Sequence, residues 1–224
     1  MAVTDEAIQR IKDMITEGRL APGDRLPPEK ELSEQLGLSR NSLREAVKAL
    51  ELIRVLDVRR GDGTYVTSLE PALLLEAMSF VIDLHDDQSI LEILAVRRIL
   101  EPASSSLAAQ HADETQLEML QKIVDAVETD ASVEDLVAHD LQFHGAIARA
   151  AGNGYLASLL DSLSSHTVRA RIWRGITQEH AVDQTLSEHR AILQAIAAGD
   201  STLAEALTLA HVAGVEQWLR SAAL

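Results

Sequence analysis

Apolar positions along the N-terminal part of the chain predict three short helices. Between Thr4 and Gly18 the apolar residues recur at steps of three and four, which is the spacing of one buried helix face. A stretch with three prolines follows, and the helical pattern resumes over 29–36 and over 40–53, on either side of Gly37. Two helices joined by a short turn at a glycine are typical of a helix-turn-helix.

A β-hairpin is predicted directly after the third helix. Residues 55–66 alternate in polarity and are rich in β-branched side chains on either side of a Gly-Asp-Gly turn. A short hairpin in this position is the wing of a winged helix-turn-helix. The chain then reaches Pro71, and proline disfavours helix in the residue before it. We therefore expect the winged domain to span 1–68 and a linker to span 69–72.

The remainder of the chain is predicted to be helical throughout. Amphipathic spacing predicts helices over 72–85, 89–110, 113–128, 132–151, 154–176, 180–198 and 201–222. No strand pattern occurs among them, so we expect an antiparallel helical bundle over 73–224, in which sites are built from side chains on facing helices. The expected fold class is mainly α: a winged helix-turn-helix of three helices and a small β-hairpin, followed by an all-α domain.

The acidic charge of the chain is concentrated in its C-terminal part. A net charge of −15 looks unsuited to DNA binding until it is divided along the sequence. Residues 1–68 hold 11 basic and 12 acidic residues, whereas 69–224 hold 9 basic and 23 acidic ones. Within 38–60, six basic residues stand against three acidic ones, so this segment is locally positive, as a surface that contacts phosphates must be.

The amino-acid composition excludes some kinds of binding site and indicates a cellular compartment. The 224 residues include no cysteine, which excludes disulfides and thiolate metal ligands. The N-terminus lacks the apolar run of a signal peptide, and no stretch reaches the ~18 uninterrupted apolar residues of a membrane span. We expect a cytoplasmic protein with no membrane partner.

The third predicted helix begins with a polar and basic segment. Ser39 is suited to cap it, and the N-terminal end of such a helix is the part that enters the major groove. Arg40 and Arg44 are four residues apart and share a face, from which a guanidinium can donate two hydrogen bonds to guanine. The candidate DNA contacts of this helix and of the wing are Ser39, Arg40, Asn41, Ser42, Arg44, Arg59, Arg60 and Gly61.

The alternative is that these arginines form only a solvated helix face, paired with acidic neighbours such as Glu45 and Glu51. Against it stands an ordered succession of four features: a first helix, a Pro-Pro-Glu-Lys-Glu-Leu helix, a Ser-Arg helix and a Gly-Asp-Gly-Thr-Tyr-Val wing. Such a joint pattern is far more specific than a cluster of charge, and it favours DNA binding.

The segments LPPEKELSEQLGLSRNSLREAVKAL and RRGDGTYV resemble the DNA-binding domain of GntR-type repressors, over residues ~5–68. The resemblance implies that Arg25 or Lys30 contacts DNA, in addition to the residues of the third helix and the wing tip. Where the family usually has glycine, this chain has Arg54. The third helix must therefore end without the low-cost left-handed conformation of glycine.

Four residues of the predicted bundle form a candidate metal site. Asp140 and His144 are four apart on one helix and share a face, while His189 and His211 lie on two later helices among apolar neighbours. One carboxylate and three imidazoles could bind a divalent transition metal and leave positions open for water or a ligand oxygen. The alternative is that each is a hydrogen-bonded core residue. We give that interpretation to the remaining histidines, His85, His111, His139, His166 and His180.

The segments ILAVRRILEPASSSLAA, DLQFHGAIARAAGN, SEHRAILQAIAAGD and AEALTLAHV resemble the successive helices of the FadR-type effector domain, often called FCD. In many members of that group an Asp and three His hold a metal. The positions that match are Asp140, His144, His189 and His211. The resemblance implies a divalent transition metal, with zinc first and nickel, manganese or iron as alternatives.

A metal beside a pocket would bind a small carboxylate, such as a sugar acid, by direct oxygen coordination. An arginine would then supply a second anchor, and the candidates are Arg97, Arg169 and Arg171, with Arg174 close by. The three arginines near Trp173 could equally form a solvated or interface face.

The leading hypothesis is a transcription regulator, a repressor first, with no enzymatic activity. A homodimer would bind a palindromic DNA operator, and the small carboxylate effector would bind the two conformational states unequally. Two alternatives stay open. One is a metal-dependent hydrolase, since a metal with open sites can activate water. The other is a DNA-binding protein whose metal is purely structural.

Overall fold

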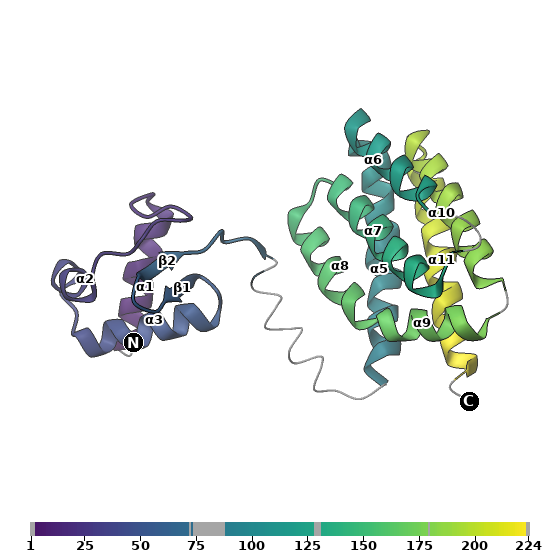
Figure 1. Cartoon of the computed structure of the whole chain (residues 1–224). Helices are drawn as coiled ribbons and strands as arrows, with labels where there is room; N and C mark the ends of the chain where they lie inside the picture. The colour runs from purple at the N-terminus through teal and green to yellow at the C-terminus, as the bar shows by residue number, and fades with distance from the viewer. Residues whose placement is uncertain (1–2, 72, 74–87, 128–130, 179, 223–224) are drawn as a thin grey trace. The chain divides into compact units, whose positions relative to one another are not determined.

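The computed structural model describes residues 3–71, 73, 88–127, 131–178 and 180–222, and divides the chain into two compact units, Met1–Ala77 and Met78–Leu224 (Figure 1). The predicted helix over 72–85 falls almost wholly outside the described residues. No helix in the described ranges is long and apolar enough to cross a membrane.

The N-terminal unit is a winged helix-turn-helix, as predicted. Its elements are α1 (Val3–Thr16), α2 (Glu29–Leu36), α3 (Arg40–Leu52), β1 (Leu56–Arg59) and β2 (Gly63–Val66). The two strands pair antiparallel, with Leu56 opposite Val66 and Arg59 opposite Gly63. Apolar side chains from all three helices and both strands form one core, in which Ile11, Leu32 and Leu43 are almost fully buried. Burial of this apolar area is the main force that holds so small a unit together.

The turn between α2 and α3 is built from residues suited to helix ends. Gly37 has φ 65°, a left-handed conformation that only glycine adopts without cost, and it closes α2. Ser39 then caps α3, because its hydroxyl accepts a hydrogen bond from the backbone N–H of Ser42 at 3.1 Å. The direction of α3, and with it the presentation of its N-terminal end, is therefore set by local sequence.

The end of α3 closes without a glycine, and Arg54 itself adopts the left-handed conformation, with φ 59°. The hydroxyl of Thr67 donates a hydrogen bond to the carbonyl of Arg54 at 2.7 Å, and Val55 N–H bonds to the carbonyl of Leu50 at 2.9 Å. These bonds hold a conformation that costs a residue with a Cβ about 1 kcal/mol.

The C-terminal unit is an all-helical domain, also as predicted. Its helices are α5 (Gln88–His111), α6 (Glu114–Asp125), α7 (Val133–Ala150), α8 (Gly154–His166), α9 (Val168–Thr177), α10 (Ala181–Ala197) and α11 (Ser201–Ala222). Helices α5 and α11 lie side by side along the middle of the unit, α7 and α10 pack on them, and α6 packs on α7 and α10 (Figure 1). The main core lies among these five helices and includes Leu120, Phe143 and Ile192. The side chains of the candidate metal site project from α7, α10 and α11.

The single helix predicted over 154–176 is wrong. The chain forms α8 and α9 instead, with a break at the fully buried Thr167, whose φ is −96° and ψ 0°. The Thr167 hydroxyl donates to the carbonyl of Ser164 at 2.9 Å and accepts from Arg97 Nη1 at 3.0 Å. A contact with an arginine 70 residues earlier in the chain cannot be inferred from local periodicity. The break turns α9 across one end of the bundle, where it contacts α7, α10 and α11 (Figure 1).

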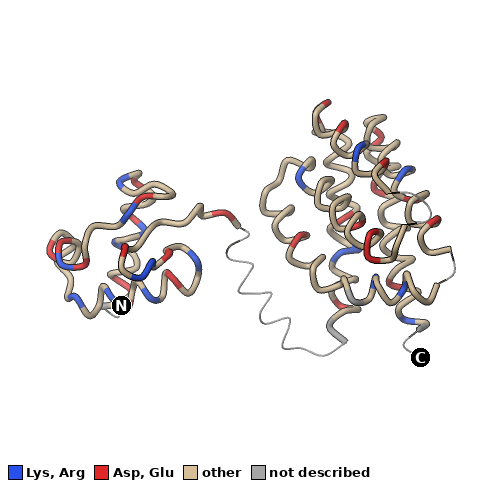
Figure 2. Tube along the Cα trace, viewed as in Figure 1, with Lys and Arg blue, Asp and Glu red and all other residues tan. Residues whose placement is uncertain are grey.

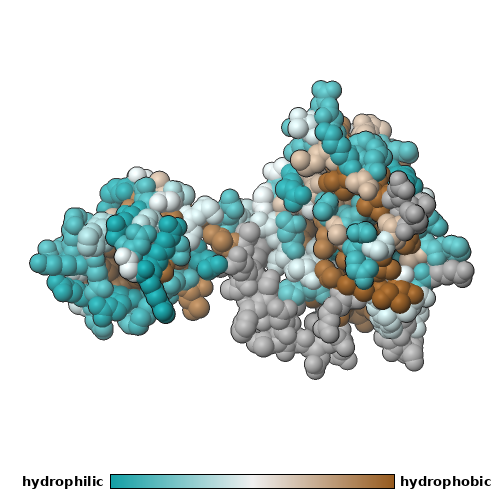
Figure 3. All heavy atoms as spheres, viewed as in Figure 1, coloured by the Kyte–Doolittle hydropathy of each residue, from teal (hydrophilic) through white to brown (hydrophobic). Residues whose placement is uncertain are grey.

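The surfaces of the two units differ in charge and hydropathy. Basic and acidic residues are mixed in the N-terminal unit, while acidic residues predominate over the helical unit (Figure 2). On the face shown in Figure 3 the N-terminal unit is mostly hydrophilic, and hydrophobic residues reach the surface of the helical unit in several places. Exposed apolar side chains of that unit include Ile99, Tyr155 and Ile176. Such residues are ordinary on a folded domain and by themselves indicate no function.

Candidate functional site

The N-terminal end of α3 carries the predicted DNA-reading side chains. Leu43 points into the core, so the opposite side of this turn faces solvent. The exposed side chains there are Arg40, Asn41 and Arg44, with Ser39 at the cap and Ser42 half-buried. The geometry required of a recognition helix is present, since its polar first turn is exposed while its apolar face is packed.

Arg44 pairs with Glu29 of α2 rather than with a glutamate of its own helix. Its Nη2 lies 2.8 Å from Glu29 Oε1, and the two side chains are 57% and 41% exposed. Glu45 pairs instead with Lys48. An exposed ion pair contributes about 0–1 kcal/mol, so DNA can replace Glu29 as the partner of Arg44 at little cost.

The wing is tied to the loop that precedes α2. Arg25 donates a hydrogen bond to the backbone carbonyl of Asp62 at the wing turn, and Tyr65 donates to the Asp62 carboxylate at 2.9 Å. The Arg59 guanidinium lies 4.2 Å from the centre of the Tyr65 ring. The remaining predicted contacts, Lys30, Arg60 and Gly61, are exposed.

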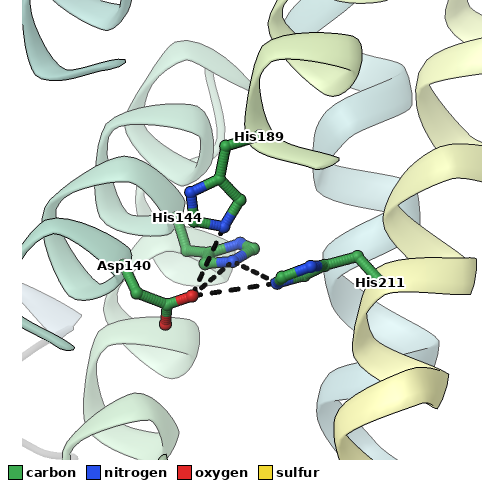
Figure 4. Close-up of side chains that lie close together, drawn as sticks. All are labelled: Asp140, His144, His189 and His211. Atoms are coloured by element: carbon green, nitrogen blue, oxygen red, sulfur yellow. Dashed lines mark hydrogen bonds and ion pairs between the residues drawn. The ribbon is translucent and has the colours of Figure 1, made fainter. Parts of the chain in front are cut away.

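The structure brings the four predicted metal-site residues together. Asp140 and His144 come from α7, His189 from α10 and His211 from α11, and all four are buried. Figure 4 shows the three imidazoles and the carboxylate pointing toward one another. One atom of each residue, Asp140 Oδ1 and the Nε2 atoms of the histidines, lies within 4.8 Å of the other three.

The separations of these atoms suit a common metal ion. Asp140 Oδ1 lies 3.6 Å from His144 Nε2, 3.4 Å from His189 Nε2 and 3.8 Å from His211 Nε2 (Figure 4). The Nε2 atoms of His144 and His211 are 3.2 Å apart. Ligands ~2.1 Å from a tetrahedral zinc ion lie ~3.4 Å from one another. We refer to these four residues as the Asp/His group.

Each imidazole of the Asp/His group has a partner on its other nitrogen. His144 Nδ1 lies 3.0 Å from Glu101 Oε2, His189 Nδ1 lies 3.0 Å from His139 Nε2, and His211 Nδ1 lies 2.7 Å from Glu188 Oε2. Metal-binding histidines almost always donate their second N–H to such an outer partner, which fixes the ring and its tautomer. In its neutral form each ring can therefore direct an Nε2 lone pair into the group.

Sequence reasoning missed the three outer partners. Glu101 follows Arg97 by four residues, so its place on the same helix face could have been found from spacing. Glu188 and His139 are direct neighbours in sequence of His189 and Asp140, but adjacent residues on a helix project in different directions. Only the packing of α5, α7, α10 and α11 shows that they face the group.

Burial and charge set the ionisation of the Asp/His group. Burial lowers the pKa of His144, but the carboxylates of Glu101 and Asp140 outweigh it and raise that pKa to about 9. Burial raises the pKa of Asp140, but Arg171 and then His144 hold it well below its usual value. Burial lowers the pKa of His189 well below its usual range. At neutral pH Asp140 is therefore a carboxylate and His189 is neutral, and a bound metal must displace a proton from His144.

A small cavity opens beside the Asp/His group, and three arginines are among the residues that line it. Arg171 Nη1 lies 2.5 Å from Asp140 Oδ2, and its Nη2 has no hydrogen-bond partner among the described residues. Arg97 Nε lies 2.5 Å from Glu101 Oε1. Arg174 also lines the cavity. All three guanidinium side chains are buried, so the solvated-face alternative is wrong for Arg171 and Arg174. The side chain of Arg169 lies outside the described part of the structure.

Comparison with known proteins covers both units. The model for bacterial regulatory proteins of the gntR family matches residues 3–66, and the FCD domain model matches residues 92–214. Over 214 residues the chain is 34% identical to the HTH-type transcriptional regulator LutR of Bacillus subtilis, with 92% of this chain and 96% of that protein covered. Over 223 residues it is 28% identical to the galactonate operon transcriptional repressor of Escherichia coli, with 97% and 96% covered.

A solved structure gives the same result. The fold is similar to that of GntR from Streptococcus agalactiae, with a TM-score of 0.72 and 27% sequence identity over 96% of this chain and 99% of that one. The two family models, the relatives and the winged helix-turn-helix agree with one another. This chain therefore belongs to the gntR family of bacterial regulatory proteins, carries an FCD domain and is a transcription regulator.

Proposed function

We propose that this regulator is a repressor whose affinity for its operator is controlled by a small carboxylate bound beside a divalent metal ion. The observation that carries the proposal is the convergence of four possible ligand atoms, Asp140 Oδ1 and three Nε2 atoms, in a buried position. Four acceptors so close together repel one another unless a cation, or a proton, lies between them. An arginine-lined cavity beside them supplies a place for an anion.

Zinc is the metal that this donor set suits first. Three imidazoles and one carboxylate oxygen are borderline ligands that zinc accepts, and nickel, manganese and iron are the alternatives. When bound, such a metal supplies a Lewis-acidic centre at which an oxygen of the effector can replace water. The residues that would hold it are Asp140, His144, His189 and His211.

The charges around the cavity favour an anionic effector. Glu101 and Asp140 pair with Arg97 and Arg171. Glu188, which is bonded to His211, interacts electrostatically with Arg174, so three carboxylates balance the three guanidinium groups of the cavity. The metal then adds two positive charges without a counter-ion. A small carboxylate would neutralise them and could also accept hydrogen bonds from Arg171, because guanidinium and carboxylate pair in a planar, two-bond geometry. The name of the galactonate operon repressor makes sugar acids the first class to examine.

Operator binding is assigned to a homodimer. One recognition helix and one wing contact too little DNA to select a single operator, whereas two copies on a palindromic site double the contacts. The effector can change operator affinity only if it binds the DNA-competent and DNA-released states unequally. The relatives are named as transcription regulators, which does not favour the hydrolase alternative.

Thermal unfolding of the full-length protein, with and without zinc, tests the metal site. Zinc that binds the folded state raises the melting temperature by mass action. We expect this rise for the wild type and for the His180→Ala control, whose histidine is exposed and lies outside the Asp/His group, but not for His211→Ala. An equal rise in His211→Ala would contradict the proposed site.

A further inference from the structure

His139 lies behind the Asp/His group and is not one of its members. It precedes Asp140 on α7 and is 3% exposed. One of its ring nitrogens, Nδ1, is 3.1 Å from the backbone carbonyl of Ile123 in α6. The other, Nε2, is 3.0 Å from Nδ1 of His189 in α10. This imidazole thus connects the α6 backbone to one of the four metal-site residues.

The two hydrogen bonds determine where the protons sit. A carbonyl oxygen can only accept a hydrogen bond, so Nδ1 of His139 must carry the hydrogen. In a neutral imidazole the other nitrogen is then an acceptor, and His139 Nε2 receives its hydrogen bond from His189 Nδ1–H. His189, neutral with its hydrogen on Nδ1, is left with a lone pair on Nε2, the atom 3.4 Å from Asp140 Oδ1.

We propose that His139 is a positioning residue that holds His189 in the tautomer with its Nε2 lone pair directed into the Asp/His group. The inference deepens the proposed function and rests on its metal site. The outer partners of His144 and His211 are carboxylates. An ionised carboxylate can only accept a hydrogen bond, so no further group is needed to make it the acceptor of an imidazole N–H. His189 alone of the three relies on another histidine, which is itself set by a backbone carbonyl.

Packing against Phe143 holds the imidazoles of His139 and His189 in place. The Phe143 ring is stacked on His189 with centroids 4.2 Å apart, and it lies nearly parallel to His139 at 6.2 Å. Phe143 is fully buried, so neither imidazole has room to rotate away from the other. Without His139, a proton on His189 Nε2 would have Asp140 Oδ1 as an acceptor at 3.4 Å. A bond between Nε2–H and Oδ1 would occupy two of the four atoms that a metal requires.

Zinc affinity of the full-length protein, measured by competition with a chromophoric chelator, tests this role. We expect His139→Leu to weaken zinc binding by ~10–100-fold, the usual loss for an outer partner. His139→Gln should retain most of the affinity, because its amide can donate to the Ile123 carbonyl and accept from His189. The matched control is His111→Leu, which removes an imidazole 3.1 Å from the Ala151 carbonyl, outside the group. Unchanged affinity in His139→Leu, or an equal loss in His111→Leu, would overturn the proposal.

A second measurement needs neither a variant nor a metal. Long-range ¹H–¹⁵N correlation spectra of histidine-labelled, metal-free wild type distinguish the two tautomers of His189. The expected form carries the hydrogen on Nδ1, and a hydrogen on Nε2 would overturn the role of His139. If the wild type binds no zinc at all, the proposed metal site fails, while this spectrum still decides the tautomer.

Discussion

Replacement of Arg44 by alanine separates DNA reading from folding. The ion pair that Arg44 makes with Glu29 is exposed on both sides, so its loss should cost under about 1 kcal/mol of stability. A bidentate contact to a guanine contributes about 1–3 kcal/mol of discrimination. The proposed homodimer on a palindromic operator would lose this contact twice, which is about 2–6 kcal/mol, or roughly a 30-fold to 2 × 10⁴-fold weaker complex.

Fluorescence anisotropy with a labelled operator, at fixed salt, measures this loss. Arg10→Ala is the matched control, because Arg10 also lies on a helix and forms an exposed ion pair, with Glu6 at 3.2 Å, but belongs to α1. Arg44→Ala should lose operator affinity much more than affinity for unrelated DNA, and Arg10→Ala should show only the small loss of one positive charge. Operator binding by Arg44→Ala that equals that of Arg10→Ala would refute the assignment of α3 as the recognition helix.

Three further changes test parts of the fold that support the two sites. Arg54→Gly should be more stable than Arg54→Ala by about 1 kcal/mol in chemical denaturation, because the native φ of 59° suits glycine; equal stabilities would contradict this reasoning. Phe143→Ala should cost about 3–5 kcal/mol, since it empties a fully buried position stacked on His189, and a loss under about 1 kcal/mol would show that the core there is not tightly packed. Arg171→Met should destabilise the chelator-treated protein by about 3–5 kcal/mol, because the buried Asp140 carboxylate loses the nearer of its two positive partners and keeps only His144, which it shares with Glu101; added zinc should restore part of that loss, and an unchanged urea midpoint would argue against the pair.

Much of the fold could be predicted because it follows from local patterns. Helix ends at Gly37 and Ser39 obey capping rules, and the hairpin follows from alternation around a Gly-Asp-Gly turn. The break at Thr167 could not be predicted in this way, since it depends on a hydrogen bond from Arg97, far away in the sequence. The conformation of Arg54 was missed for a related reason: hydrogen bonds outside the helix stabilise it.

The candidate metal site, like the fold, follows partly from local spacing and partly from packing. Asp140 and His144 share a helix face by spacing, whereas the meeting of that face with His189 and His211 depends on how α7, α10 and α11 pack. Periodicity could not identify Glu188 and His139 as outer partners. Their role follows only from the imidazole nitrogens that they contact in the folded structure, those of His211 and His189. Periodicity thus indicates which residues share a face, and packing decides which faces meet.

Operator affinity as a function of effector and metal tests the central claim most directly. Anisotropy titrations would compare zinc-loaded wild type, chelator-treated wild type and zinc-treated His211→Ala against a panel of small hydroxy acids and sugar acids, galactonate included. The account predicts that at least one acid shifts the operator affinity of the zinc-loaded wild type and leaves the other two unchanged. An equal shift in the chelator-treated protein, or no shift with any acid of the panel, would contradict it.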